Sequence, residues 1–193
     1  MDQICVKKRD TAIKAKRLRQ LGMVPGNIIG KSLPESISIQ MEEAEARRLV
    51  RQLREGSKIS IDLEGQAIPA QIKEKSLNTL NNGILHLSFQ ALVGDEKVNS
   101  VIHILLANEE KAGNQLEKMM MEIPYASLPA DMIDTITIDL DGMAVGTVVM
   151  VKDIPELMSD TIELRADPEE IVLRISDKTY QGSQTEADES EET

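Results

Sequence analysis

Seven basic side chains lie within the first nineteen residues of the chain, against two acidic ones. They are Lys7, Lys8, Arg9, Lys14, Lys16, Arg17 and Arg19. Ammonium and guanidinium groups at this density bind phosphate oxygens, and such contacts supply most of the sequence-independent affinity of a protein for nucleic acid. Their spacing does not fit one helix face, so the side chains point in several directions, as contacts to a phosphate-rich surface require. The alternative is a solvated basic surface without a ligand.

The sequence contains no pattern that predicts catalysis or a metal site. It has no phosphate-binding P-loop, no dinucleotide-binding glycine motif and no histidine-containing metal motif. Cys5 is the only cysteine, and with two histidines it does not make a usual structural zinc site. We therefore expect no enzyme, no catalytic residue, no cofactor and no metal.

The composition is typical of a soluble globular protein, with 41% hydrophobic and 28% charged residues among 193. No apolar run approaches the roughly 18 residues that cross a membrane, and the first residues lack the apolar stretch of a secretory signal. We therefore expect a cytoplasmic protein that does not contact membranes. Aromatic residues make up only 2%, which disfavours single-strand binding by base stacking and favours structured RNA, read through phosphates and 2′-hydroxyls.

The formal net charge of −11 is unevenly distributed along the chain. Residues 1–59 carry a balance of +6, whereas residues 100–193 carry −15. This asymmetry predicts a polyanion-binding surface at the N-terminal end and an acidic end that is repelled from the same polyanion.

Period-two alternation of apolar residues predicts short strands at 37–41, 59–63 and 68–72. An apolar stripe at Ala46, Leu49, Val50 and Leu53 predicts a helix within residues 41–56. The arginines of this helix are explained by a solvated face with a Glu43–Arg47 pair. A second, shorter helix is compatible with the basic segment, with Asp10 or Thr11 as its cap.

The sequence Asn81-Asn82-Gly83 predicts a hairpin turn. In the strand that follows it, Leu85, Leu87 and Phe89 are expected in the core, and His86 and Ser88 on the opposite face. Further strands are predicted near residues 101–106, 136–140, 148–151 and 171–175, whereas residues 111–129 fit either a loop or a strand. The result is a mainly β protein with domains at 1–93 and 94–178 and an acidic disordered tail at 179–193.

Arg9 and the following KRLRQLGMVPGNIIGK resemble the opening of the bacterial large-subunit ribosomal protein twenty-five family. The segment HLSF is similar to that family's His-x-Asp-Phe. SLPADMIDTITIDLDGMAVGTVVMVKDI and DPEEIVLRI resemble the extra domain of the long form, called Ctc or general stress protein. The resemblance covers about residues 4–176.

This resemblance implies a small N-terminal β-barrel with one or two helices that binds 5S ribosomal RNA, followed by a second β-rich domain. The implied RNA-binding residues are Arg9, Lys14, Lys16, Arg17, Arg19 and His86. The implied partners are 5S rRNA and the large ribosomal subunit, with neighbouring ribosomal proteins contacting the C-terminal domain.

The chain departs from the family pattern at positions that would read bases or sugars. Ile29 replaces a tyrosine, Ser88 an aspartate, and Ser76-Leu77 a Gln-Arg pair. The phosphate-binding charges are kept, which predicts retained affinity with weaker sequence discrimination. The alternative hypothesis is a divergent, stress-associated protein-interaction module that no longer binds RNA.

Overall fold

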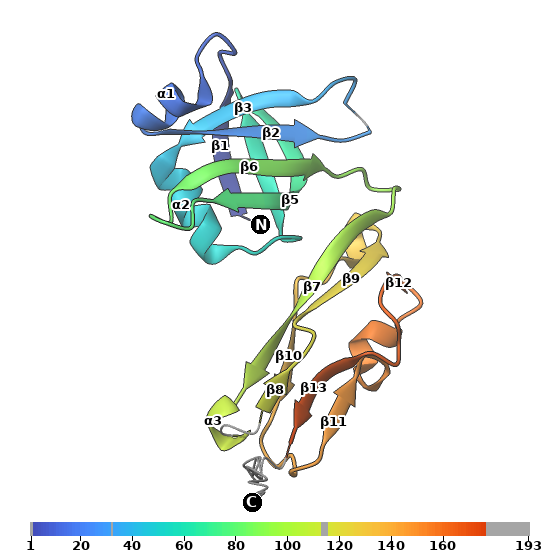
Figure 1. Ribbon diagram of the computed structural model, residues 1–193. Helices are drawn as coiled ribbons and strands as arrows, with labels where there is room; N and C mark the ends of the chain where they lie inside the picture. The colour runs from blue at the N-terminus through green and yellow to red at the C-terminus, as the bar shows by residue number, and fades with distance from the viewer. Residues whose placement is uncertain (1, 32, 113–115, 177–193) are drawn as a thin grey trace, which may run out of the picture.

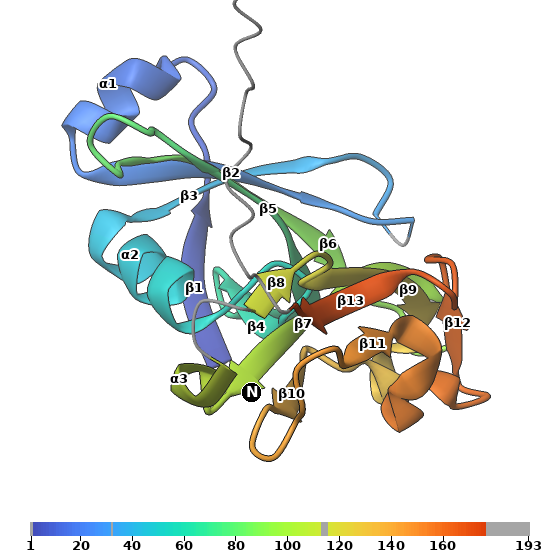
Figure 2. The ribbon, with the colours of Figure 1, turned by 60° about the horizontal axis from the view of Figure 1, so that its bottom comes forward.

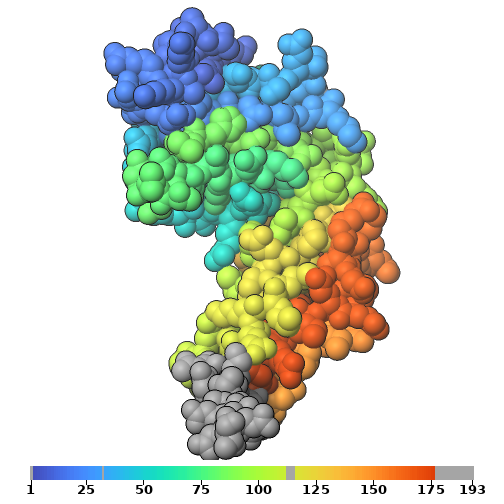
Figure 3. All heavy atoms as spheres, viewed as in Figure 1, coloured from blue at the N-terminus to red at the C-terminus, as the bar shows by residue number. Residues whose placement is uncertain are grey.

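The computed structural model describes residues 2–31, 33–112 and 116–176, which form two parts connected through strand β7 (Figure 1). The N-terminal part is a closed six-stranded barrel with two helices, and the second part is built from two small sheets. The predicted fold class, mainly β with a small N-terminal barrel and a β-rich second domain, is confirmed. The surface narrows where the two parts meet (Figure 3).

The barrel strands follow one another around the closed sheet in the order β1-β3-β2-β6-β5-β4. They are β1 (Asp2–Lys8), β2 (Met23–Ile29), β3 (Ile37–Glu42), β4 (Lys58–Leu63), β5 (Gln66–Leu77) and β6 (Ile84–Ala91). Their inward residues are almost all aliphatic, and Phe89 is the only aromatic side chain in this core. Alternation therefore directs polar residues outward along most of the strands, whereas β2 presents Asn27 between Pro25 and Ile29.

Two helices accompany the barrel, α1 (Ala15–Gln20) and α2 (Glu43–Gln52). Helix α2 buries its predicted stripe at Ala46 and Leu49, and the predicted Glu43–Arg47 ion pair is present at 2.6 Å. The predicted cap of the first helix is wrong, because the cap residue is Lys14. Asp10 instead accepts the backbone N–H of Ala12 in the turn that precedes the helix.

The predicted hairpin joins β5 and β6 as an antiparallel pair, with Asn82 in the left-handed region at φ 50°. The expected core position of Leu85 is wrong. A register shift after the Ser76–His86 pair sets Leu77 opposite Ile84, so Ile84 is buried and Leu85 is only half-buried. A bulge of this kind inserts one residue and breaks the simple alternation.

The second part contains a four-stranded sheet, β10-β7-β9-β12, and a three-stranded sheet, β11-β13-β8. Its elements are β7 (Val98–Ala107), α3 (Glu109–Ala112), β8 (Leu116–Lys118), β9 (Glu122–Ser127), β10 (Thr135–Asp139), β11 (Val148–Met150), β12 (Ile162–Leu164) and β13 (Ile171–Ile175), with short 3-10 turns at Pro129–Asp131, Val151–Asp153 and Pro155–Met158. Tyr125 is fully buried between these sheets, and its hydroxyl donates to the Ile133 carbonyl at 2.9 Å. Residues 111–129, which fitted either a loop or a strand in the sequence, contain the two short strands β8 and β9.

The residue at which the first domain ends and the second begins stays a prediction. Strand β6 ends at Ala91 and β7 begins at Val98, on either side of the expected boundary at residues 93 and 94. The expected disordered tail, 179–193, lies outside the described residues, as do positions 177 and 178 of the expected second domain.

Four side chains form hydrogen bonds across the junction between the two parts, and each uses a main-chain carbonyl as its partner. The bonds are Lys58 Nζ to Pro129 O at 2.9 Å, Gln71 Nε2 to Asn99 O at 3.0 Å, Ser100 Oγ to Gly56 O at 3.4 Å, and His103 Nε2 to Glu55 O at 2.8 Å. Gln71 and His103 are buried, so their bonds are shielded from competing water. A small apolar cluster of Leu92, Val98 and Met132 completes the junction.

Gly56→Ala is expected to loosen this junction. A Cβ at position 56 would lie 2.6 Å from Ser100 Oγ and 2.9 Å from the Val101 carbonyl, so β7 must move away from the barrel. We expect a larger radius of gyration in small-angle X-ray scattering and a lower free energy of unfolding. Gly65→Ala is the matched control, because φ is similarly positive there, +92° against +85°, but no atom lies within 4 Å of the added Cβ. Equal scattering curves for both variants would contradict the expectation.

Candidate nucleic-acid interface

The outer face of β1, β3, β2, β6 and β5 carries two rows of polar side chains. One row contains Lys7, Gln40, His86 and Ser76, which follow from the Lys7–Gln40 and Ser76–His86 pairs. The other contains Ser38, Asn27, Ser88 and Glu74, through the Asn27–Ser38, Asn27–Ser88 and Glu74–Ser88 pairs. Arg9 joins this second row, since its N–H donates to the Ser38 carbonyl at 2.9 Å. The face is a mainly polar surface built from strands distant in sequence, with Pro25 of β2 paired to Gln40 within the first row.

Three polar side-chain atoms on or beside this face are buried without a hydrogen-bond partner in the described part of the chain: Arg9 Nε, Asn27 Oδ1 and Gln40 Oε1. An unsatisfied buried donor or acceptor is costly, by about 1–3 kcal/mol, and each such group in a native structure needs an explanation. A ligand that supplies both donors and acceptors would satisfy them. Asn27 and Gln40 were not among the predicted site residues.

Arg9 and His86 lie close enough on this face for their charges to interact. The Arg9 Nη2 group donates to the Ile13 carbonyl at 3.1 Å, which holds the guanidinium against the loop before α1. Burial lowers the pKa of His86 below 6.5; the Glu74 carboxylate opposes this shift, and the Arg9 charge adds to it. The pKa of His86 is therefore determined by its burial and by two charged groups on the face predicted to bind RNA, Glu74 and Arg9.

The basic residues of α1 divide into two kinds. Lys14, Lys16 and Arg17 are exposed. Arg19 is half-buried and donates from Nη1 to the Leu85 carbonyl at 3.2 Å, so it ties α1 to the bulge of β6. Figure 2 shows the hairpin loop of β5 and β6 beside α1. Between them lies a hollow of about 390 Å³, lined in part by Lys16, Arg19, Asn78 and Asn81.

Ser76, Ser88 and Ile29, three of the four positions that depart from the family pattern, lie on the outer face, whereas Leu77 pairs with the buried Ile84 beyond the bulge. Ser88 and Ser76 belong to its two rows, and Ser76 lies directly opposite His86 in the ladder. Ile29 pairs with Gln90 at the far end of β2 and is half-buried. The structure therefore brings Arg9, His86 and three of the four altered positions onto one surface, with the cations of α1 at its margin.

His86 should titrate below 6.5 in the free protein, and its neighbours should move its pKa in opposite directions. Glu74→Gln is expected to lower the pKa further, and Arg9→Gln to raise it, because the first variant removes the opposing charge and the second the reinforcing one. A ¹H–¹³C NMR titration of the imidazole resonances measures both shifts. Since the unfolded chain binds more protons between the lowered pKa and 6.5, we expect the contribution of His86 to reduce stability as the pH falls through this window.

The described residues contain no group of three or more His, Cys, Asp or Glu side chains arranged to hold a metal ion. Within the same residues, no helix is long and apolar enough to span a membrane.

Comparison with known proteins relates both parts of the chain to ribosomal proteins. The model of the ribosomal L25p family matches residues 4–89, and the model of the C-terminal domain of ribosomal protein TL5 matches residues 97–179. The chain is 28% identical to the large ribosomal subunit protein bL25 of Caldanaerobacter subterraneus subsp. tengcongensis, over 88% of this chain and 86% of that protein. It is 25% identical to bL25 of Listeria innocua, over 89% of this chain and 84% of that protein. The chain belongs to the ribosomal L25p family in its long, two-domain form, whose members are structural proteins rather than enzymes.

Proposed function

We propose that this structural protein of the large ribosomal subunit binds 5S rRNA through the outer face of its barrel. The observation that carries the proposal is the polar face itself, where Arg9 Nε and Asn27 Oδ1 are buried without partners while exposed cations lie at its edge. Phosphates need donors and RNA sugars offer both donors and acceptors, so structured RNA satisfies both kinds of group. Such a protein would act on cytoplasmic ribosomes.

The proposed contact residues have separate tasks. Lys14, Lys16 and Arg17 bind phosphates from α1, and Arg19 holds that helix against β6 while its remaining N–H groups face the hollow. Arg9 and His86 lie on the polar face, where Arg9 offers a guanidinium and His86 an imidazole that is largely neutral at pH 7. Ser76 and Ser88 flank His86, so hydroxyl groups stand where the family pattern has side chains that form stronger hydrogen bonds to bases. We therefore infer that discrimination between RNA sequences is modest.

The acidic second part would face away from the RNA. Residues 97–176 contain 15 acidic and 6 basic side chains, and this charge is repelled by phosphate. Neighbouring ribosomal proteins are its proposed contacts, since proteins that sit on RNA are themselves basic.

Titration of the full chain with 5S rRNA across a salt series tests the proposal. We expect saturable binding whose logarithm falls linearly with the logarithm of the salt concentration, and a modest preference over an unrelated RNA of equal length. Absence of saturable binding at low salt would overturn the proposal and favour a protein-interaction module without RNA.

A further inference from the structure

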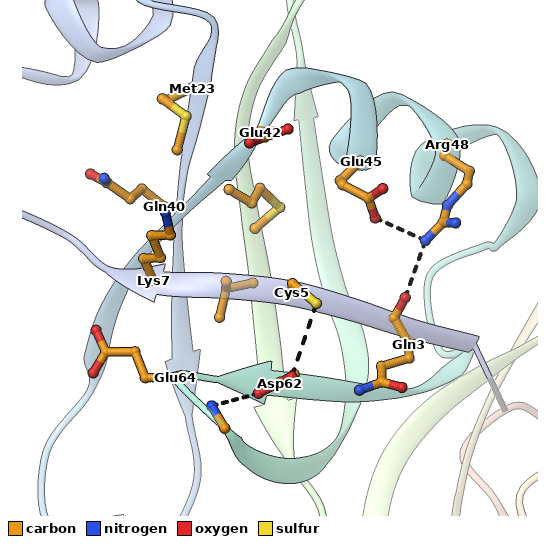
Figure 4. Close-up of a pocket in the computed structure, with 13 residues that line it drawn as sticks. Gln3, Cys5, Lys7, Met23, Gln40, Glu42, Glu45, Arg48, Asp62 and Glu64 are labelled. Carbon is orange, nitrogen blue, oxygen red and sulfur yellow. Dashed lines mark hydrogen bonds and ion pairs between the residues drawn. The ribbon is translucent and has the colours of Figure 1, made fainter.

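The barrel is not paired along the full length of β1 and β3. Their ladder contains the Lys7–Gln40 and Lys8–Ile39 pairs, whereas the earlier residues of β1, Asp2–Val6, are paired with β4 alone. Strand β3 meanwhile runs into α2. The separation leaves an open cavity of about 820 Å³ (Figure 4), a size typical of ligand sites.

Main-chain groups of β1 point into this gap. Hydrogen-bonding direction alternates along a strand, and the bond from Arg9 N to Ser38 O assigns the odd-numbered residues of β1 to the side facing β3. The Gln3 carbonyl, on that side, accepts Arg48 Nη2 at 3.2 Å. By the same alternation the N–H and C=O of Cys5 point into the gap. Neither has a ladder partner among the described residues of β3, and such an edge is a template for another strand.

The cavity has an apolar floor and an acidic rim. Val6 and Met41 are buried at its floor. Its charged lining residues are Lys7, Glu42, Glu45, Arg48, Asp62 and Glu64. Arg48 is already paired with Glu45 at 2.8 Å, which leaves three carboxylates against Lys7. Figure 4 shows the side chains of Glu42, Asp62 and Glu64 around the opening, with Cys5 between them.

We propose that this gap binds an extended, basic segment of a partner protein, which adds a strand between β1 and β3. Its main chain would pair with the free groups of Cys5, and its side chains would alternate between the floor and the rim, in the manner of strand addition at a sheet edge. Apolar side chains would pack on Val6 and Met41, and lysines or arginines would contact Glu42 and Glu64.

The charges exclude two other occupants. RNA phosphates are repelled by the carboxylates of the rim, so the gap is distinct from the RNA face that it adjoins at the Lys7–Gln40 pair. The C-terminal residues 177–193 of the chain carry six acidic side chains and one basic side chain, so this segment is repelled as well. A basic partner segment is the occupant whose charge is complementary.

Cys5 provides a direct probe of occupancy, because it is the only cysteine of the chain and is exposed in the gap. The experiment measures the rate at which a thiol reagent modifies the full-length protein in the presence of a six-residue peptide of alternating lysine and valine. At a peptide concentration that saturates most of the protein, we expect modification to slow by about tenfold, since only the free fraction reacts. Chemical-shift changes at the backbone amides of Cys5 and Glu42 should saturate at the same peptide concentration.

Matched probes separate strand pairing from simple attraction between charges. The same peptide with methylated main-chain nitrogens keeps its charge but loses its donors, and a peptide of alternating glutamate and valine keeps its pairing groups but reverses the charge. Neither should protect Cys5. Glu42→Gln with Glu64→Gln should weaken protection by the basic peptide about tenfold or more, whereas Glu110→Gln with Glu156→Gln, which removes equal charge from the second part, should leave protection unchanged.

Four results would overturn the proposal: no protection by the basic peptide, equal protection by the methylated peptide, equal protection by the acidic peptide, or protection by an RNA duplex. The last would assign the gap to nucleic acid. All the variants change exposed or half-buried carboxylates, so circular dichroism should confirm that each remains folded.

Discussion

Replacing Lys14, Lys16 and Arg17 with alanine is expected to weaken RNA binding by about two to three orders of magnitude at 0.1 M salt, if each binds one phosphate. The reason is counterion release, because each neutralised phosphate frees roughly 0.9 cation on binding to a duplex. The slope of log affinity against log salt should therefore flatten by about 2.7. These three side chains are exposed, so the stability of the barrel should change little.

A triple variant in α2 and the turn that follows it is the matched control for this prediction. Arg47, Arg51 and Arg54 are also exposed and carry the same charge, and Arg47 is paired with Glu43. Their replacement by alanine should leave the salt slope almost unchanged. An equal loss of RNA affinity in both triple variants would mean that net charge, rather than the surface beside α1, determines affinity. Arg19→Ala should differ from both sets by also destabilising the packing of α1, since its bond to the Leu85 carbonyl is lost.

Gly26→Val should destabilise the barrel by about 3 kcal/mol or more, in the range of severe overpacking. A Cβ at this position would lie 2.6 Å from the Leu87 carbonyl and 3.3 Å from the Ile39 side chain. Because the first neighbour is backbone of the paired strand β6, no side-chain rotation relieves the clash. Urea unfolding measured by circular dichroism gives the difference in free energy.

Gly94→Val is the control for this substitution. No atom lies within 4 Å of a Cβ at that position, and its φ lies outside the left-handed region. We expect its unfolding free energy to stay close to that of the unchanged protein. A similar loss of unfolding free energy in both variants would indicate a general cost of removing glycine rather than a close approach between β2 and β6.

The sequence predicted most of the barrel because burial on one face imposes a period of two. Residues 37–41 and 59–63 form strands as expected, and the stripe at Ala46 and Leu49 packs as a helix. The predictions were wrong at the bulge of β6, where one strand has an extra residue, and at the N-terminal cap of α1. The bulge that buries Ile84 in place of Leu85 depends on how β5 pairs with β6, which local alternation does not encode.

The proposed site was only partly predictable for a related reason. Exposed cations are visible in sequence, and Lys14, Lys16 and Arg17 lie on the surface of α1 or at its cap. Asn27 and Gln40 become notable only when β1, β3 and β2 pair, because that pairing buries their oxygens without partners. The position of Gln40 between Ile39 and Met41 on a predicted strand was the available signal that it faces outward, whereas Asn27 lies outside the predicted strands.

At the junction between the two parts, mutations should matter at the residues whose side chains form the hydrogen bonds and not at the residues that supply only a main-chain carbonyl. Every cross-junction hydrogen bond described above ends on a main-chain carbonyl, of Glu55, Gly56, Asn99 or Pro129. A side-chain substitution at Glu55 or Asn99 leaves its carbonyl in place, whereas a substitution at Gln71 or His103 removes the bond. A saturation scan of this region would thus find few intolerant positions among many neutral ones, and the orientation of the second domain would survive extensive sequence divergence.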